Sequence, residues 1–163
     1  MLRRSSLVIV SARIIVMTNN QKMLLLQRGY THDFAPGLWE FPGGKLNDQS
    51  GIFDIKLVLP EALRELSEET GIELGPANSK LDHWGATDES AAAFGHNGDK
   101  IYTHIFICRW PEEIVAPTPR LSSEHINYVW AEVGELKDFS LTPVTAVVVR
   151  AILEEKQRFA SLA

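Results

Sequence analysis

Three glutamates in the stretch RELSEETGI, residues 64–72, are spaced to share one face of a helix. At about 100° per residue, Glu65, Glu68 and Glu69 fall within an arc of roughly 100°, and an earlier glutamate, Glu61, points into the same arc. Like charges at this spacing cost a few tenths of a kcal/mol per pair, so the face is destabilising unless a cation neutralises it. Carboxylate oxygens suit Mg²⁺ or Mn²⁺, whose remaining positions water or phosphate oxygens can fill.

Two glycines before this segment favour a cation site over the alternative of a solvated helix face. Glu is a good helix former and a common surface residue, so the glutamates alone would favour the solvated face. Gly43 and Gly44, however, lie in WEFPGGK, upstream of the expected helix. A glycine turn can bring backbone carbonyls and amides close to a metal ion or a phosphate, because no Cβ intervenes.

The order of WEFPGGK and RELSEETGI resembles the Nudix hydrolase family. The family's signature is a glycine, five residues, Glu, seven residues, then Arg-Glu-apolar-any-Glu-Glu-any-Gly-apolar, and its second half is intact from Arg64 to Ile72. At average residue usage this half would arise by chance in on the order of one chain in 10⁵ of this length. The resemblance implies an α/β fold, the Nudix-like α/β/α sandwich with a mixed β-sheet between helices.

The resemblance also implies roles for individual residues. Glu65, Glu68 and Glu69 match the family's metal-binding glutamates, and the carbonyl of Gly44 matches a further ligand. Arg64 matches the arginine that orients a glutamate through an ion pair, with an exposed helix arginine as the alternative. The implied cofactor is Mg²⁺, with Mn²⁺ as the alternative ion.

The first half of the signature departs from the pattern. Counting back from Arg64, its glycine falls at Ser50 and its lone glutamate at Lys56. If Gly44 is the true counterpart, the segment carries six extra residues, because 64 minus 44 is 20 where the signature needs 14. An insertion is the simplest explanation.

We expect this insertion to form a surface loop at about 46–59, followed by a helix that begins at Pro60. Proline is tolerated at a first helical position, and it disfavours a helical conformation in the residue before it. Gly71 would end the helix. Asp48 or Asp54 could replace the missing carboxylate, although each is equally well explained as a turn residue.

A second acidic position lies far from the motif, in SSEHINYVW. In MutT-type members of the family, a glutamate six residues before a similar tryptophan acts near the metals, and here 130 minus 124 is six. By this resemblance, Glu124 is the candidate general base or an additional metal ligand, with a solvated loop glutamate as the alternative. Glu68 is the next candidate for the base.

The histidines and the cysteine do not suggest a zinc site. His83, His104 and His125 have no zinc-ligand spacing, so we interpret all three as structural. Cys108 is the only cysteine and lies in an apolar stretch, which excludes a cysteine cluster and a disulfide framework.

The function that these observations predict is Mg²⁺-dependent cleavage of the pyrophosphate linkage in a nucleoside diphosphate linked to another moiety, with a nucleoside triphosphate as the first choice. Strict 8-oxo-dGTP specificity is not expected, because the position matching the family's purine-reading asparagine is Leu141. Two alternatives stay open: a nucleotide-sugar or ADP-ribose pyrophosphatase, and a non-catalytic Nudix-like domain that senses a nucleotide.

The size, charge and local patterns of the chain agree with a compact enzyme. The 163 residues suffice for one domain over 1–163, and a net charge of -5 offers no broad basic surface for a polymeric nucleic acid. No segment suits a membrane span, and we expect a cytoplasmic protein that acts on a small nucleotide, with a homodimer as an open alternative. The expected elements are a hairpin over 7–16 and 23–28, strands at 80–88, 101–110 and 126–133, and a last helix from Pro143.

Overall fold

The computed structural model describes residues 7–47, 49, 54–74, 80–90, 99–111 and 116–155. In chain order its elements are β1 (Val8–Met17), β2 (Lys22–Arg28), β3 (Trp39–Glu40), β4 (Gly43–Lys45), α1 (Ile55–Thr70), β5 (Lys80–Ser90), β6 (Lys100–Arg109), β7 (His125–Glu132), the 3₁₀ helix η3 (Val133–Asp138) and α2 (Pro143–Glu154). Among these residues, no helix has the length and apolar character needed to cross a membrane.

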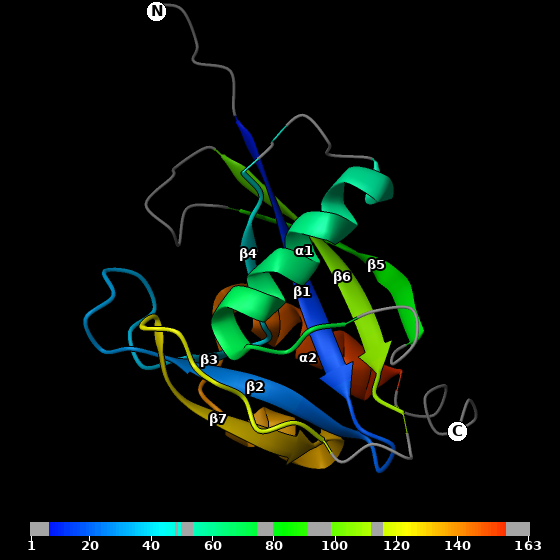
Figure 1. Ribbon diagram of the computed structural model, residues 1–163. Coiled ribbons are helices and arrows are strands. Elements are labelled where there is room, and N and C mark those ends of the chain that lie inside the picture. Colours follow the sequence, from blue (N-terminus) through cyan, green and yellow to red (C-terminus); the bar gives the residue numbers. More distant parts are fainter. Residues whose placement is uncertain are drawn as a thin grey trace, which may run out of the picture.

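The strands form one mixed sheet in the order β3-β2-β1-β6-β5, with β4 also paired to β1 and β7 also paired to β2 (Figure 1). Strands β1 and β6 run parallel along the whole of β1, whereas the other named pairs are antiparallel. The predicted hairpin is confirmed, because β1 and β2 are antiparallel and meet at the pair Met17 and Met23. Beyond this pair β1 continues beside β4 and β6, and β2 continues beside β7.

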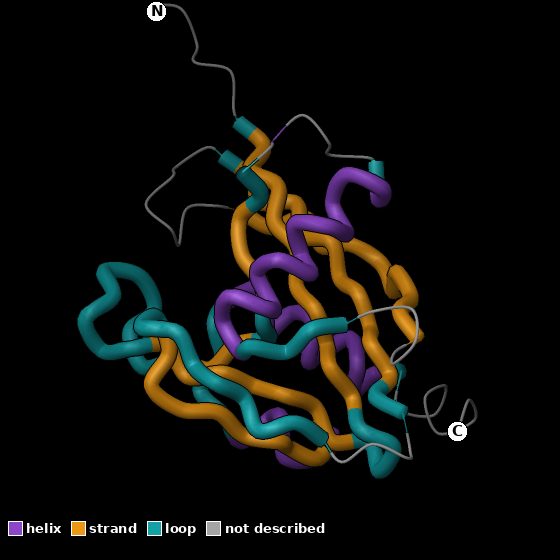
Figure 2. Tube along the Cα trace, in the orientation of Figure 1, coloured by secondary structure: helices purple, strands orange, loops and turns teal. Residues whose placement is uncertain are grey.

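The helices α1 and α2 cover opposite faces of this sheet (Figures 1 and 2). Val10 and Ile14 of β1 belong to the core cluster that includes Leu66 of α1. Ile15 of the same strand belongs to the cluster that includes Val148 of α2. Because side chains alternate along a strand, β1 contributes to both layers of the core. The expected α/β/α sandwich with a mixed sheet is confirmed.

The start of α1 differs from the prediction. The helix begins at Ile55, and Pro60 lies inside it. Asp54 caps the helix, since its side chain accepts a hydrogen bond from the backbone N–H of Lys56 at 3.0 Å. Pro60 has no N–H, so the helix loses one backbone hydrogen bond there. The helical turn before Pro60, however, buries Val58 completely in the core, which stabilises the earlier start. The prediction of a helix start at Pro60 was wrong, because this burial and the cap favour an earlier start.

The part of the expected loop at 46–59 that precedes α1 lies between β4 and α1. Leu46 is buried in the core. Gln49 binds both backbone groups of Val10, accepting from its N–H at 2.7 Å and donating to its carbonyl at 3.1 Å. These described residues are therefore anchored to the sheet. Asp48, one of the two candidates for the missing carboxylate, lies outside the described residues.

Candidate metal centre

Helix α1 divides the three glutamates of the motif between a cleft and solvent. Glu65 and Glu69 line a cleft of about 380 Å³, and Glu69 is only 4% exposed. The side chain of Glu68 is 58% exposed, and Nη1 of Arg64 contacts its Oε2 at 2.9 Å. Nη2 of the same arginine contacts Oε1 of Glu65 at 3.0 Å. Arg64 therefore links a glutamate of the cleft to a glutamate at the surface.

Strand β4 holds the two glycines against α1. It pairs with β1, which places Gly44 opposite Ala12. Gly43 has a φ of +144°, and a Cβ there would lie 2.0 Å from the carbonyl oxygen of Ala12, so only glycine fits. The N–H of Gly43 donates to Oε2 of Glu69 at 2.9 Å. A Cβ on Gly44 would lie 3.4 Å from the Glu65 carboxylate, so each glycine lies against one glutamate of the cleft.

Glu69 is a buried acid without full compensation of its charge. Burial raises its pKa to about 8, and the charges of Glu40 and Glu65 act in the same direction. Arg13 and the hydrogen bond from Gly43 lower the pKa but do not offset the burial. The carboxylate form is thus disfavoured at neutral pH unless another positive charge is present. A divalent cation would supply that charge.

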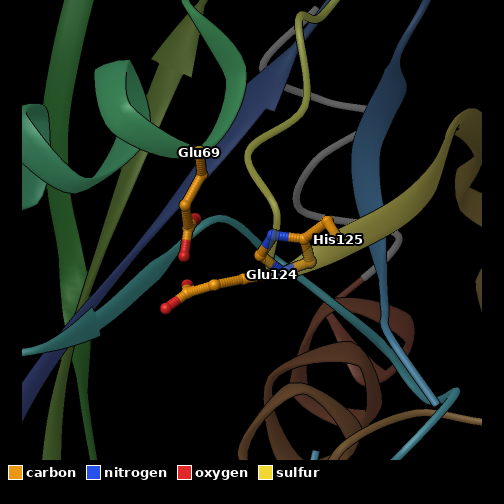
Figure 3. Close-up of side chains that lie close together, drawn as sticks. All are labelled: Glu69, Glu124 and His125. Atoms are coloured by element: carbon orange, nitrogen blue, oxygen red, sulfur yellow. The ribbon is translucent and has the colours of Figure 1, made fainter. Parts of the chain in front are cut away.

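The loop before β7 brings a third carboxylate to the cleft. One ligand atom each from Glu69, Glu124 and His125 lie within 4.8 Å of one another, and Figure 3 shows the three side chains converging. Glu124 is exposed, but its backbone carbonyl accepts from the N–H of Gly29 at 3.0 Å and contacts Nε2 of His32 at 2.7 Å. The structure thus places Glu124, the residue chosen by its spacing from Trp130, in the cleft beside Glu69.

A second buried acid, Glu40 of β3, lies beside this cluster and was not identified from the sequence. Its Oε2 contacts Nη1 of Arg13 at 3.3 Å, and its Oε1 contacts Nη1 of Arg28 at 3.1 Å. Nε2 of His125 lies 3.0 Å from the same Oε1. Burial raises the pKa of Glu40, but Arg13, the hydrogen bond with His125, and Arg28 together bring it down to about 2. Glu40 is therefore an ionised carboxylate at neutral pH.

A local signal for Glu40 does exist in the sequence. Arg13 is a charge within the apolar run of β1, and Glu40 is a charge between the aromatic residues Trp39 and Phe41. A charge that is buried requires a partner, so the two residues are a candidate pair. What the sequence lacks is any spacing that connects them.

Basic, aromatic and small polar or apolar side chains line the remaining part of the cleft. The guanidinium of Arg28 lies 5.8 Å from the ring centre of Phe34, and both line the cleft. Thr142 and Val144, at the start of α2, also line it. Leu141 instead packs against the core beneath α2. The cleft is also lined by Ser11, Arg13, Glu40, Gly43, Gly44, Lys45 and Ile101.

Other residues considered from the sequence lie elsewhere. Asp54 caps α1, which is the turn role weighed for it. His83 and His104 contact each other between Nε2 and Nδ1 at 3.1 Å on β5 and β6. Cys108, the single cysteine of the sequence, is buried. Within the part of the chain that the structure describes, these side chains do not line the cleft.

The residues that are present fit a divalent cation. Glu65, Glu69 and Glu124 offer hard carboxylate oxygens around one cleft, and Gly44 brings backbone to the same place. The uncompensated burial of Glu69 gives an independent reason for a cation there.

Comparisons with known proteins agree with this geometry. The family model described as the NUDIX domain matches residues 8–152. A MutT protein from Methanosarcina mazei Go1 superposes with a TM-score of 0.68 at 22% identity, over 96% of this chain and 99% of that one. The Escherichia coli ORF135 protein superposes with a TM-score of 0.65 at 25% identity, over 93% of each chain.

Two further relatives carry ligand or substrate names. The NUDIX domain of Shewanella oneidensis NrtR, complexed with ADP ribose, superposes with a TM-score of 0.64 at 18% identity, over 93% of this chain and 89% of that one. The m7GpppN-mRNA hydrolase NUDT17 of Danio rerio is 39% identical over 67 residues, which are 41% of this chain and only 20% of that relative. The family match spans most of the chain and includes every residue that lines the cleft, so the chain belongs to the NUDIX domain family.

Proposed function

We propose that the chain is a Mg²⁺-dependent hydrolase that cleaves the pyrophosphate linkage of a nucleoside diphosphate linked to another moiety, with a nucleoside triphosphate as the preferred substrate. The main support for this proposal is that acidic, basic and aromatic side chains all line one cleft. Acidic side chains occupy the side formed by α1 and the loop before β7, and basic and aromatic side chains line the same cleft. A volume of about 380 Å³ suits one nucleotide.

The proposed ligands are Glu65, Glu69 and the carbonyl of Gly44. Glu68 joins them only if its carboxylate leaves Arg64, which holds it at 2.9 Å. Mn²⁺ is the alternative ion for these oxygen donors. When bound, the ion supplies stabilisation of the negative charge on the phosphate oxygens. Arg64 is a positioning residue, because it orients Glu65 without lining the cleft itself.

The substrate would extend from the acidic side of the cleft toward α2. Arg28 and Lys45 offer charge-assisted hydrogen bonds to phosphate oxygens, and the Phe34 ring offers an apolar face to the base. Glu124 would accept the proton of the attacking water as the new P–O bond forms and the anhydride P–O bond breaks. A nucleoside triphosphate would give a nucleoside monophosphate and pyrophosphate. Glu68 is the alternative base.

A panel of nucleotides with Mg²⁺ tests this assignment. Nucleoside triphosphates, ADP-ribose, a nucleotide sugar and a capped dinucleotide should be compared at equal concentration by product chromatography. The proposal predicts the fastest release of pyrophosphate from a triphosphate, abolished by EDTA. Fastest turnover of ADP-ribose or the nucleotide sugar would instead favour the linked-diphosphate alternative, in keeping with the ADP ribose in NrtR. Tight binding without turnover of any compound would identify a nucleotide-sensing domain.

A further inference from the structure

His125 is a buried histidine whose two ring nitrogens have different surroundings. It is 5% exposed at the start of β7. Its Nε2 lies 3.0 Å from Oε1 of Glu40. Its Nδ1 is buried and has no hydrogen-bond partner among the residues that the structure describes. A buried polar atom left unpaired is costly, so this nitrogen requires an explanation.

The contact with Glu40 determines which nitrogen carries the proton. Arg13 and Arg28 both contact the Glu40 carboxylate, so it is ionised and can only accept hydrogen bonds. Nε2 of His125 must therefore donate to it. In the neutral imidazole this leaves the lone pair on Nδ1, which is the form in which a histidine binds a metal.

The ring also lies beside the acids of the cleft. A ring nitrogen of His125 and a carboxylate oxygen of both Glu69 and Glu124 lie within 4.8 Å of one another. Figure 3 shows the imidazole facing the two carboxylates, one from α1 and one from the loop before β7. A cation between these groups would be within reach of the imidazole, whose nitrogen without a hydrogen-bond partner among the described residues is Nδ1.

We propose that Nδ1 of His125 is a ligand of the cation bound by Glu69, beside Glu124, and that Glu40 fixes the ring for this role through Nε2. This inference rests on the proposed function, because it takes the same cleft to be the cation site. A histidine that ligates a metal and donates its other N–H to a carboxylate is a recurrent arrangement in metal sites. Imidazole favours Mn²⁺ and later transition ions over Mg²⁺, so the site should prefer Mn²⁺ more strongly than an all-oxygen site would.

Pulsed electron paramagnetic resonance of bound Mn²⁺ tests the ligand directly, without substrate. Wild-type protein should show ¹⁴N modulation from a bound imidazole, and protein grown with ¹⁵N-histidine should show the corresponding change of pattern. His125→Gln should abolish the modulation, since the glutamine amide can still donate to Glu40 but lacks Nδ1. It should also raise the Mn²⁺ dissociation constant at least about tenfold, and the Mg²⁺ constant by less. His83→Gln is the matched control and should leave both unchanged.

The outcomes separate this inference from the proposed function. Mn²⁺ bound without nitrogen modulation in wild type, or modulation that survives in His125→Gln, would overturn the histidine ligand and leave an all-oxygen hydrolase site in place. Failure of Mn²⁺ and Mg²⁺ to bind wild type would overturn both. If His125→Gln does not fold, labelled wild-type protein together with single Gln variants of the other four histidines, His32, His83, His96 and His104, decides the matter. Loss of modulation in any of these four variants would contradict the assignment to His125.

Discussion

Glu40 and Glu69 are two buried glutamates in one cleft, with opposite electrostatic environments. Glu40 is 2% exposed and Glu69 is 4% exposed, so both carry a large desolvation cost. The chain compensates Glu40 with two arginines, and the pKa of that carboxyl is about 2. It gives Glu69 far less compensation, and there the pKa is about 8. Glu40 is therefore neutralised within the fold, whereas the negative charge of Glu69 is not, which is the property that the proposed cation site requires.

Removing Glu124 should produce the largest effect if the chemistry takes place on the Glu69 side of the cleft. Because a general base acts in the transition state, Glu124→Gln should lower kcat by roughly 10² to 10⁴ with little change in KM. Steady-state kinetics at several Mg²⁺ concentrations provide the measurement. Partial recovery at high Mg²⁺ would identify Glu124 as a metal ligand instead. Wild-type kinetics would move the base to Glu68.

Removing the charge of Glu40 should lower the stability of the folded protein, whatever its effect on metal binding. Glu40→Gln leaves Arg13 and Arg28 without their anion, so the free energy of unfolding should fall by about 3–5 kcal/mol. Urea unfolding followed by circular dichroism measures this loss. Glu154→Gln, an exposed acid on α2, is the control and should change stability by less than about 0.5 kcal/mol. A similarly small effect of Glu40→Gln would mean that the cluster is not the compensated ion pair described above.

The two acids should also give opposite pH dependences. The raised pKa of Glu69 means that the folded state binds more protons than the unfolded state between pH 4.5 and about 8, so stability should fall as pH rises through this window. The slope from this group is at most about 1.4 kcal/mol per pH unit. Glu40, with a lowered pKa, contributes stability above pH 4.5 that is lost as pH falls toward 2.

Urea unfolding of metal-free protein at intervals from pH 5 to pH 8 measures the first of these dependences. Subtracting the same series for Glu69→Gln isolates the contribution of Glu69. Saturating Mg²⁺ should flatten the wild-type series, because the ion keeps the carboxylate ionised. If the free energies of unfolding of wild type and Glu69→Gln differ by the same amount at every pH, Glu69 is not a buried, protonated acid.

The sequence predicted the parts of this site that depend on local spacing. Glu65 and Glu69 are four residues apart on one helix, and Glu124 immediately precedes β7, six residues before Trp130 of that strand. The helical period and the family signature therefore identified them. Glu68 shares their arc, but its side chain is exposed and pairs with Arg64, which the spacing does not predict.

The parts that the sequence did not predict depend on contacts between distant segments. Glu40 meets Arg13, Arg28 and His125 because β1, β2, β3 and β7 come together in one sheet. The start of α1 likewise depends on the burial of Val58 by the sheet, which overrides a local rule about proline. Neither effect leaves a periodic signal in the sequence.

Metal-dependent thermal stabilisation of Glu69→Gln is the most direct test of the central claim that this buried acid binds a cation. In wild type, Mg²⁺ added to EDTA-treated protein should raise Tm, and the rise should grow with the ratio of the Mg²⁺ concentration to the dissociation constant. Glu69→Gln should lose most of this rise, and its metal-free Tm should not fall at pH 7.5, because a neutral amide replaces an acid that is costly to ionise there. Glu154→Gln should respond to Mg²⁺ like wild type. Equal rises in Tm for wild type and Glu69→Gln would contradict the assignment of the cation to this glutamate.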